Sequence, residues 1–461
     1  MIEELRVAAG DAWEWTLSIY LGLPWWAVPI FWVAAIVVVS SATSLAILIV
    51  RAQVAIHRAE RAPKAVHGRA DQGEYLWVFF VPALNEEITI RDSVGRLREV
   101  DVDHKRILVI NDGSDDRTGE ILSTMDQRDL TVLTRVAPNA RQGKSEALND
   151  AWRYLSGTLL AHGDLSGWDP RRVIVTIVDA DGRLDRQAGK VAHHFADDRV
   201  GGGQSLVRIY NRRSPLTWAQ NIEFSVFGFV FQMGRVSWGT ANMGGNGQFN
   251  RLQALNEVAV PGQYGTIGPW REGRLTEDQD IGLRLIRAGW EGRQSTVVTV
   301  DQQGLNSLRA LYRQRTRWAQ GGWQMLDLVP AMARNPHLGF VAKWDQFWYL
   351  MTPLLQAFVG ATVVLSIVLF ATGLVEVRWT VPIAVLIYIF SIVPGVAGVL
   401  FARRTLNPLR IIAQVILAHG YALYSWLIFP VVYRALWRYL RGSKSWAKTR
   451  REAIEGREAR G

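Results

Sequence analysis

Four long apolar stretches constrain the structure of this chain more than any other feature of its sequence. They cover residues 25–50, 347–375, 379–402 and 411–433, and none contains an Asp, Glu, Lys or Arg. Each exceeds the roughly 20 residues that a helix needs to cross a bilayer. A helix in the core of a soluble domain rarely runs so far without a charge, so we predict a multi-pass membrane protein. The first stretch is too long, and begins too late, for a cleavable signal peptide.

Basic residues predict the orientation of these helices. Five of them follow the first apolar stretch, namely Arg51, Arg58, Arg61, Lys64 and Arg69. Positive charge collects on the cytoplasmic side of a cell membrane, so we expect residues 70–345 in the cytoplasm and the N-terminus outside.

The C-terminal tail does not fit four simple crossings. Residues 434–461 hold nine Lys or Arg and three acidic residues, yet a fourth crossing would place them outside. The stretch 411–433 contains Pro430 and a His419-Gly420 pair, so we interpret it as the candidate for a re-entrant segment.

The composition narrows the classes of function and partner. The formal charge of +10 suits anionic lipids or an anionic substrate. Nucleic acid is a weaker interpretation, because the sequence has no known nucleic-acid module and its basic residues cluster beside apolar stretches. The absence of cysteine excludes disulfides, zinc–thiolate sites and cysteine nucleophiles.

Between the apolar stretches, short β-branched or aromatic runs alternate with helical patterns. Predicted strands are 75–84, 106–111, 130–136, 173–178 and 204–210, and predicted helices are 86–98, 117–125, 144–155 and 276–288. Such alternation is typical of an α/β domain with a mostly parallel sheet, in which ligands bind beyond the carboxyl ends of the strands. The sequence has no Gly-x-Gly-x-x-Gly and no Walker loop, which disfavours a dinucleotide fold or a P-loop ATPase.

Acidic residues follow the predicted strands. Asp179 and Asp181 point to the same side of an extended segment, so both carboxylates can bind one Mg²⁺ or Mn²⁺ together with substrate phosphates. A simple Asp-Gly turn is the alternative. Asp112 can accept hydrogen bonds from a nucleobase or ribose, while Ser114 or Asp115 caps the next helix.

Three further groups carry candidate chemistry. Lys144 can donate to phosphate near a helix start, or can simply be solvated. Asp278, in Thr276-Glu277-Asp278, can act as a general base, although acidic residues also favour helix N-termini. Helical spacing puts Gln314, Arg317 and Trp318 on one face, as expected for a diphosphate and sugar site or for an interfacial amphipathic helix.

Taken in order, these clusters resemble the membrane-bound family 2 glycosyltransferases, which include cellulose, chitin, hyaluronan and poly-N-acetylglucosamine synthases. The resemblance implies a GT-A fold, a UDP-sugar donor and inversion at the anomeric carbon. It assigns Asp112 to the nucleotide, Asp179 and Asp181 to nucleotide and metal, and Asp278 to the base. The candidate substrate-binding residues are Pro82, Asn85, Glu86, Asp112, Lys144, Asp179, Asn246, Glu277, Gln314, Arg317 and Trp318.

Two products are compatible with this resemblance. The leading hypothesis is a processive synthase that elongates a β-linked polysaccharide and exports it. The alternative is a glycolipid synthase that transfers one sugar to diacylglycerol or another lipid, which the small number of apolar stretches favours. The segment from Gly244 to Phe249 resembles members of both kinds, and Gln279 departs from the apolar or acidic residue expected after Asp278. Carboxylates outside the apolar stretches argue against a transporter.

The predicted organisation has six parts. They are an N-terminal segment with the first membrane helix (1–50), a basic linker (51–74), a cytoplasmic GT-A catalytic domain (75–303), interfacial helices with the Gln-x-x-Arg-Trp motif (304–345), C-terminal membrane helices (346–433) and a basic tail (434–461).

Overall fold

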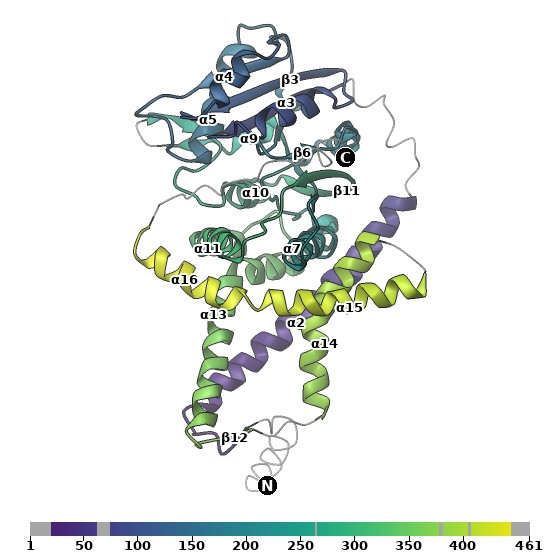
Figure 1. Ribbon diagram of the computed structural model, residues 1–461, viewed down its shortest axis with the longest axis vertical. Coiled ribbons are helices and arrows are strands. Elements are labelled where there is room, and N and C mark those ends of the chain that lie inside the picture. Colours follow the sequence, from purple (N-terminus) through teal and green to yellow (C-terminus); the bar gives the residue numbers. More distant parts are fainter. Residues whose placement is uncertain (1–19, 62–73, 263–264, 378–380, 404–406, 444–461) are drawn as a thin grey trace.

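The computed structural model describes residues 20–61, 74–262, 265–377, 381–403 and 407–443. The start of the predicted N-terminal segment, half of the predicted linker and most of the predicted tail lie outside these residues. The described part consists of an α/β domain and a set of long apolar helices that extend from it (Figure 1).

An eight-stranded sheet forms the centre of the α/β domain, with the order β4-β3-β2-β5-β8-β7-β11-β6. Four of its seven neighbouring pairs are parallel, which confirms the predicted mostly parallel α/β fold. The strands are β2 (Leu76–Ala83), β3 (His104–Asn111), β4 (Leu130–Thr134), β5 (Val173–Ile177), β6 (Arg183–Leu184), β7 (Val200–Ile209), β8 (Gln248–Arg251) and β11 (Glu291–Gln302).

Helices cover both faces of this sheet. The side chains of Trp77 and Phe79 pack on one face with helices α3 and α4, while Val78 and Phe80 pack on the other with α5, α9 and α10. Burial on both faces explains why β2 is apolar almost throughout. The helices of the domain are α3 (Ile90–Arg98), α4 (Thr118–Ser123), α5 (Lys144–Tyr154), α6 (Ala192–Phe195), α7 (Pro215–Ser225), α8 (Met233–Arg235), α9 (Leu252–Glu257), α10 (Glu277–Arg287), α11 (Leu308–Gln324) and α12 (Val329–Ala333).

The first predicted helix begins later than expected. The sequence predicts it from residue 86, but α3 starts at Ile90. The backbone N–H groups of Glu86 and Glu87 donate instead to Thr118 Oγ1 and to Asp116, on the loop after β3. The end of β2 is thereby fixed to that loop, and both border the pocket described below.

Long apolar helices form the second part of the structure. They are α2 (Val28–Arg61), α13 (Phe340–Ala371), α14 (Val381–Arg403), α15 (Pro408–Ser425) and α16 (Ile428–Leu440). Among the described residues, three runs are long and apolar enough to cross a membrane, namely Val28–Arg61, Phe340–Ala371 and Pro408–Leu440, with a shorter apolar run at Ile387–Arg403.

These helices differ in direction. Figure 1 shows α2, α13 and α14 extending away from the sheet, whereas α15 and α16 lie across them at the base of the α/β domain. The predicted fourth stretch, 411–433, is thus divided between two helices around Trp426. At the far end, β1 (Tyr20–Leu21) pairs with β12 (Glu376–Val377), which brings the beginning of α2 close to the end of α13.

A buried ion pair fastens α13 to the α/β domain. Arg235, on α8, donates from Nε to Asp345 Oδ2 over 2.7 Å and from Nη2 to Asp345 Oδ1 over 3.2 Å. Both side chains are buried. The first turns of α13 therefore belong to the packed domain, before the helix leaves it.

Candidate active site

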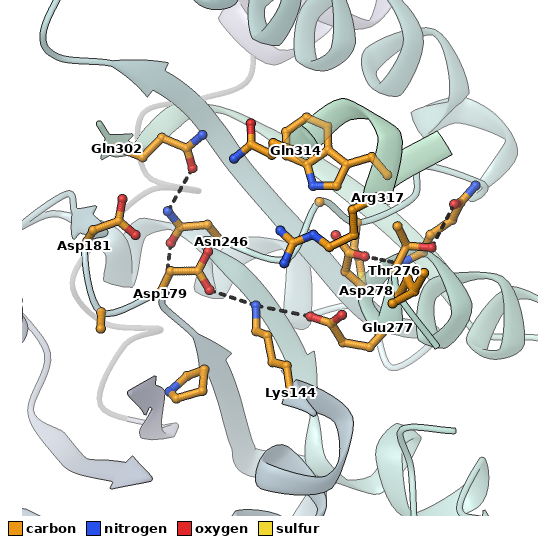
Figure 2. A pocket seen from close by; sticks show the side chains of 18 of the residues that line it. Lys144, Asp179, Asp181, Asn246, Thr276, Glu277, Asp278, Gln302, Gln314 and Arg317 are labelled. Carbon is orange, nitrogen blue, oxygen red and sulfur yellow. Dashed lines mark hydrogen bonds and ion pairs between the residues drawn. The ribbon is translucent and has the colours of Figure 1, made fainter. Parts of the chain in front are cut away.

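A pocket of about 400 Å³ lies where β2 and β5 end and where α5 and α10 begin. Helix α11, the irregular helix Val226–Gln232 that continues α7, and Tyr349 of α13 close its other side. The pocket contains every candidate substrate-binding residue except Asn85, together with Asp181 and Asp278. Segments more than 200 residues apart in the sequence thus form one site, as Figure 2 shows for ten of its side chains.

Asp112 lines the pocket and is held by one guanidinium group and one backbone N–H. Its Oδ1 accepts from Arg135 and, over 2.9 Å, from the backbone N–H of Arg141. Arg135 also donates to Asp150 over 2.6 Å. These contacts fix the carboxylate of Asp112 at the end of β3, where it can accept from a bound nucleoside.

Lys144 is the first residue of α5 and bridges two acidic segments (Figure 2). Its Nζ lies 2.7 Å from Asp179 Oδ1 and 3.2 Å from Glu277 Oε1. Burial opposes its positive charge, but the two carboxylates outweigh burial and raise the pKa of Lys144. The ammonium group is therefore charged and stands at a helix N-terminus, a suitable arrangement for a phosphate.

The Asp179–Asp181 segment is held in place by Asn246. The Oδ1 of Asn246 accepts from the backbone N–H of Asp179 over 3.1 Å, and its Nδ2 donates to Gln302 over 3.2 Å (Figure 2). Asn246 thus shapes the segment in addition to lining the pocket.

Two carboxylates, Asp179 and Asp181, line the pocket at this position. In the described part of the chain, no group of three or more His, Cys, Asp or Glu residues could hold a metal ion. Mg²⁺ is commonly bound by one or two carboxylates with waters and substrate phosphates, so this pair fits a cation that arrives with a diphosphate.

Asp278 occupies the first turn of α10, with one oxygen directed at the backbone of the next residue. Its Oδ1 accepts from the N–H of Gln279 over 2.8 Å. Its Oδ2 faces Gly245, where φ is +79° and an added Cβ would lie 3.0 Å from that oxygen. Burial and the neighbouring Glu277 raise the pKa of Asp278 to about 7, although Lys144 opposes the shift. A carboxylate with this pKa is suited to proton transfer near neutral pH.

Helix α11 contributes Gln314, Arg317 and Trp318 to the same pocket, as their helical spacing predicts. Figure 2 shows the guanidinium of Arg317 pointing into the cavity beside Asp278. The ring of Trp318 is held between Arg315, whose Cζ is 4.0 Å from the ring centroid, and Phe224, at 6.2 Å between centroids. Such a fixed indole can stack on a sugar ring.

Asn85 is the predicted residue that lies outside the pocket lining. Its Nδ2 donates to Asp115 over 2.6 Å, and its Oδ1 accepts from the backbone N–H of the same residue. Asn85 therefore joins the loops after β2 and β3. The pocket also contains residues that no motif indicated, namely Glu223, Phe224, Phe227, Gln302 and Tyr349. Their local sequence is that of ordinary helices and strands, so only the folded chain identifies them.

The family models and the relatives that match this chain all describe glycosyltransferases. The family described as "Glycosyl transferase family group 2" matches residues 174–437, and "Glycosyl transferase family 2" matches residues 78–259. The chain is 31% identical over 300 residues to a beta-monoglucosyldiacylglycerol synthase of Synechocystis, a match that covers 63% of this chain and 57% of that protein. It is 25% identical over 273 residues to the poly-beta-1,6-N-acetyl-D-glucosamine synthase of Staphylococcus aureus, covering 58% and 60%.

A solved structure shares the fold. The mannosyltransferase PcManGT of Pyrobaculum calidifontis, solved with GDP-Man and Mn²⁺, superposes with a TM-score of 0.53 over 89% of this chain and 99% of that one, at 18% identity. This similarity shows a common GT-A-like architecture. Because the matched family extends over more than half of the residues, the chain belongs to glycosyltransferase family 2.

Proposed function

We propose that this protein transfers a sugar from a UDP-sugar to an acceptor at the membrane, with inversion at the anomeric carbon. One observation carries the proposal: Asp278, with its raised pKa, shares a single pocket with Lys144, Arg317, Asp179 and Asp181. A base for the acceptor and cationic groups for a diphosphate leaving group are what such a transfer requires.

The donor would lie across the carboxyl ends of the strands. Asp112 would bind the nucleoside, and Lys144 and Arg317 would hold the diphosphate. Asp179 and Asp181 would hold Mg²⁺ or Mn²⁺. When bound, the cation neutralises charge that develops on the leaving diphosphate.

The acceptor would occupy the opposite side of the pocket. Its hydroxyl would donate a proton to the Oδ2 of Asp278 as its oxygen attacks the sugar from the face opposite the diphosphate. Trp318 and Phe227 make this end of the pocket aromatic, which suits either a sugar ring or the glycerol part of a lipid.

Two acceptors have specific support. A growing polysaccharide is favoured by the position of Gln314, Arg317 and Trp318, because this motif resembles that of the polysaccharide synthases. A lipid is favoured by the 31% identity to a glucosyldiacylglycerol synthase and by the few described helices that extend from the domain.

Product analysis tests the proposal. The purified full chain would be incubated with Mg²⁺, a panel of radiolabelled UDP-sugars and vesicles containing 1,2-dioleoylglycerol. A labelled product of high mass in the aqueous phase identifies a polysaccharide, and a labelled lipid with one sugar identifies a glycolipid. Absence of both products with every UDP-sugar would overturn the proposed activity.

The membrane arrangement that we propose has three crossings, by α2, α13 and α14, with the α/β domain in the cytoplasm. The β1–β12 pair brings the beginning of α2 close to the end of α13, which supports their position on one side, the outer side in this arrangement. Helices α15 and α16 would then lie along the cytoplasmic surface, as their direction across the other helices suggests (Figure 1). This arrangement keeps the basic tail inside, in agreement with the positive-inside rule.

Single-cysteine labelling checks this arrangement, since the chain has no native cysteine. An impermeant maleimide applied to intact cells should label Thr372→Cys, at the end of α13. It should not label Ser123→Cys in the α/β domain or Ser443→Cys after α16 until the cells are opened. Labelling of Ser443→Cys in intact cells would instead require a further crossing by α15 and α16.

A further inference from the structure

Tyr349 lines the pocket but belongs to α13, one of the long apolar helices. Its phenolic oxygen accepts a hydrogen bond from Gln279 Nε2 over 3.1 Å and from Asn242 Nδ2 over 3.3 Å. The orientation of the Asn242 amide is fixed, because its Oδ1 accepts from the backbone N–H of Met243 over 2.8 Å. Asn242 is therefore a donor to Tyr349, and so is Gln279, whose Oε1 accepts from Thr276 Oγ1 over 3.4 Å.

This arrangement leaves the phenolic hydrogen of Tyr349 directed elsewhere. A hydroxyl has two lone pairs and one hydrogen, and the two amides use the lone pairs. In the part of the chain that the structure describes, these are the two hydrogen bonds of the Tyr349 hydroxyl. Because Tyr349 lines the pocket, we expect this hydrogen to face a bound molecule.

The ring of Tyr349 packs against the guanidinium group of Arg235. The guanidinium carbon of Arg235 lies 4.5 Å from the ring centroid. Arg235 is itself held by its buried pair with Asp345, one turn before Tyr349 on α13. A rigid ring with a directed hydroxyl is a preorganised hydrogen-bond donor, which costs little entropy when a ligand binds.

Gln279 connects this donor with Asp278. Its backbone N–H donates to Asp278 Oδ1, and its side chain donates to Tyr349. Asp278 and Tyr349, which both line the pocket, are therefore linked through Gln279. The side chain of Gln279 therefore orients the hydroxyl of Tyr349. This contact explains why a glutamine stands where the resemblance predicts an apolar or acidic residue.

We propose that Tyr349 is an acceptor-binding residue that donates its phenolic hydrogen to an oxygen next to the attacking hydroxyl. The inference rests on the proposed function and adds a requirement for the acceptor: a second, hydrogen-bond-accepting oxygen beside the hydroxyl that reacts. A neighbouring sugar hydroxyl and the ester carbonyl of a diacylglycerol both meet this requirement. Tyr349 would thereby turn the attacking hydroxyl towards Asp278.

Tyr349→Phe tests the inference, because it removes the hydroxyl and keeps the ring beneath Arg235. Loss of one hydrogen bond between neutral groups should raise the KM for the acceptor about five- to tenfold and change kcat less. Titration with UDP should give an unchanged Kd, and the pH dependence of the rate should keep its midpoint. The probes are 1,2-dioleoylglycerol vesicles and oligomers of N-acetylglucosamine.

Tyr312→Phe is the matched control. The hydroxyl of Tyr312 donates to the backbone carbonyl of Pro430 over 3.2 Å, and the residue does not line the pocket. This variant should behave as wild type. Equal acceptor KM values in Tyr349→Phe and wild type would overturn the inference, as would a loss of UDP affinity together with a lower Tm. A wild-type chain that transfers sugar to no acceptor would overturn the proposed function instead.

Discussion

Replacing Asp278 by asparagine should lower turnover by at least about 10²-fold, the lower end of what general-base catalysis contributes. Asparagine has almost the same size and can still accept from the N–H of Gln279 through its amide oxygen, but it does not take up a proton. The Kd for UDP should stay close to that of wild type. Steady-state kinetics with a UDP-sugar and isothermal titration with UDP measure the two effects separately.

The pH dependence gives this experiment a second readout. In wild type, kcat/KM should fall about tenfold per pH unit below about 7, because Asp278 becomes protonated. In Asp278→Asn, that dependence should disappear from the residual activity.

The effect of Asp278→Asn on thermal stability should have a defined sign at high pH. The folded-state pKa of Asp278 lies above its unfolded value, so its ionisation disfavours folding as the pH rises from about 4 to about 7. The Asn variant should therefore have a Tm at pH 8 equal to or above that of wild type. Retention of most of the turnover would place the base on another residue, and a joint loss of Tm and UDP affinity would make Asp278 a structural residue.

Chelation should abolish transfer, and added Mg²⁺ or Mn²⁺ should restore it. A cation at Asp179 and Asp181 would stabilise the leaving diphosphate by several kcal/mol, so its removal should cost at least about 10²-fold in rate. Asp181→Asn should cause a comparable loss. The assay would follow release of UDP in EDTA and after metal is added back.

Asp185→Asn is the matched control for Asp181→Asn. Asp185 lies four residues further along and accepts from the backbone N–H of Gln187, outside the pocket. It should keep wild-type activity and the same response to Mg²⁺. Full activity in excess chelator would show that Lys144 and Arg317 alone neutralise the diphosphate.

Sequence reasoning identified five strands of the sheet, β2, β3, β4, β5 and β7, and three of them contain continuous apolar runs. β2, β3 and β5 are buried on both faces, so their composition reveals them. β8 consists of Gln248, Phe249, Asn250 and Arg251, a mostly polar segment that is nevertheless buried. Its polar groups bond to neighbours that are distant in sequence, for example Arg251 Nε to the carbonyl of Val200. Such partners exist only after folding, so its pattern did not predict a strand.

The pocket residues also divide into those that a local sequence pattern reveals and those that only the folded chain brings into place. Asp112, Asp179 and Asp278 were predictable because each follows an apolar run or opens a helix in a recognisable motif. Tyr349 lies within an apolar stretch whose composition indicates a membrane helix and nothing else. Its place in the pocket depends on how α13 packs against α8 and α10, which no local pattern encodes.

The Arg235–Asp345 pair has a consequence for how the enzyme can be divided. A soluble fragment that ends before residue 340 would keep Arg235 in the interior but lose its counter-ion. Loss of one partner from a buried ion pair typically costs about 3–5 kcal/mol, a large share of the stability of an ordinary domain. The same cut would remove Tyr349 from the pocket. Shortened forms intended for crystallisation should therefore extend at least through the first three turns of α13, even though those turns begin a long apolar helix.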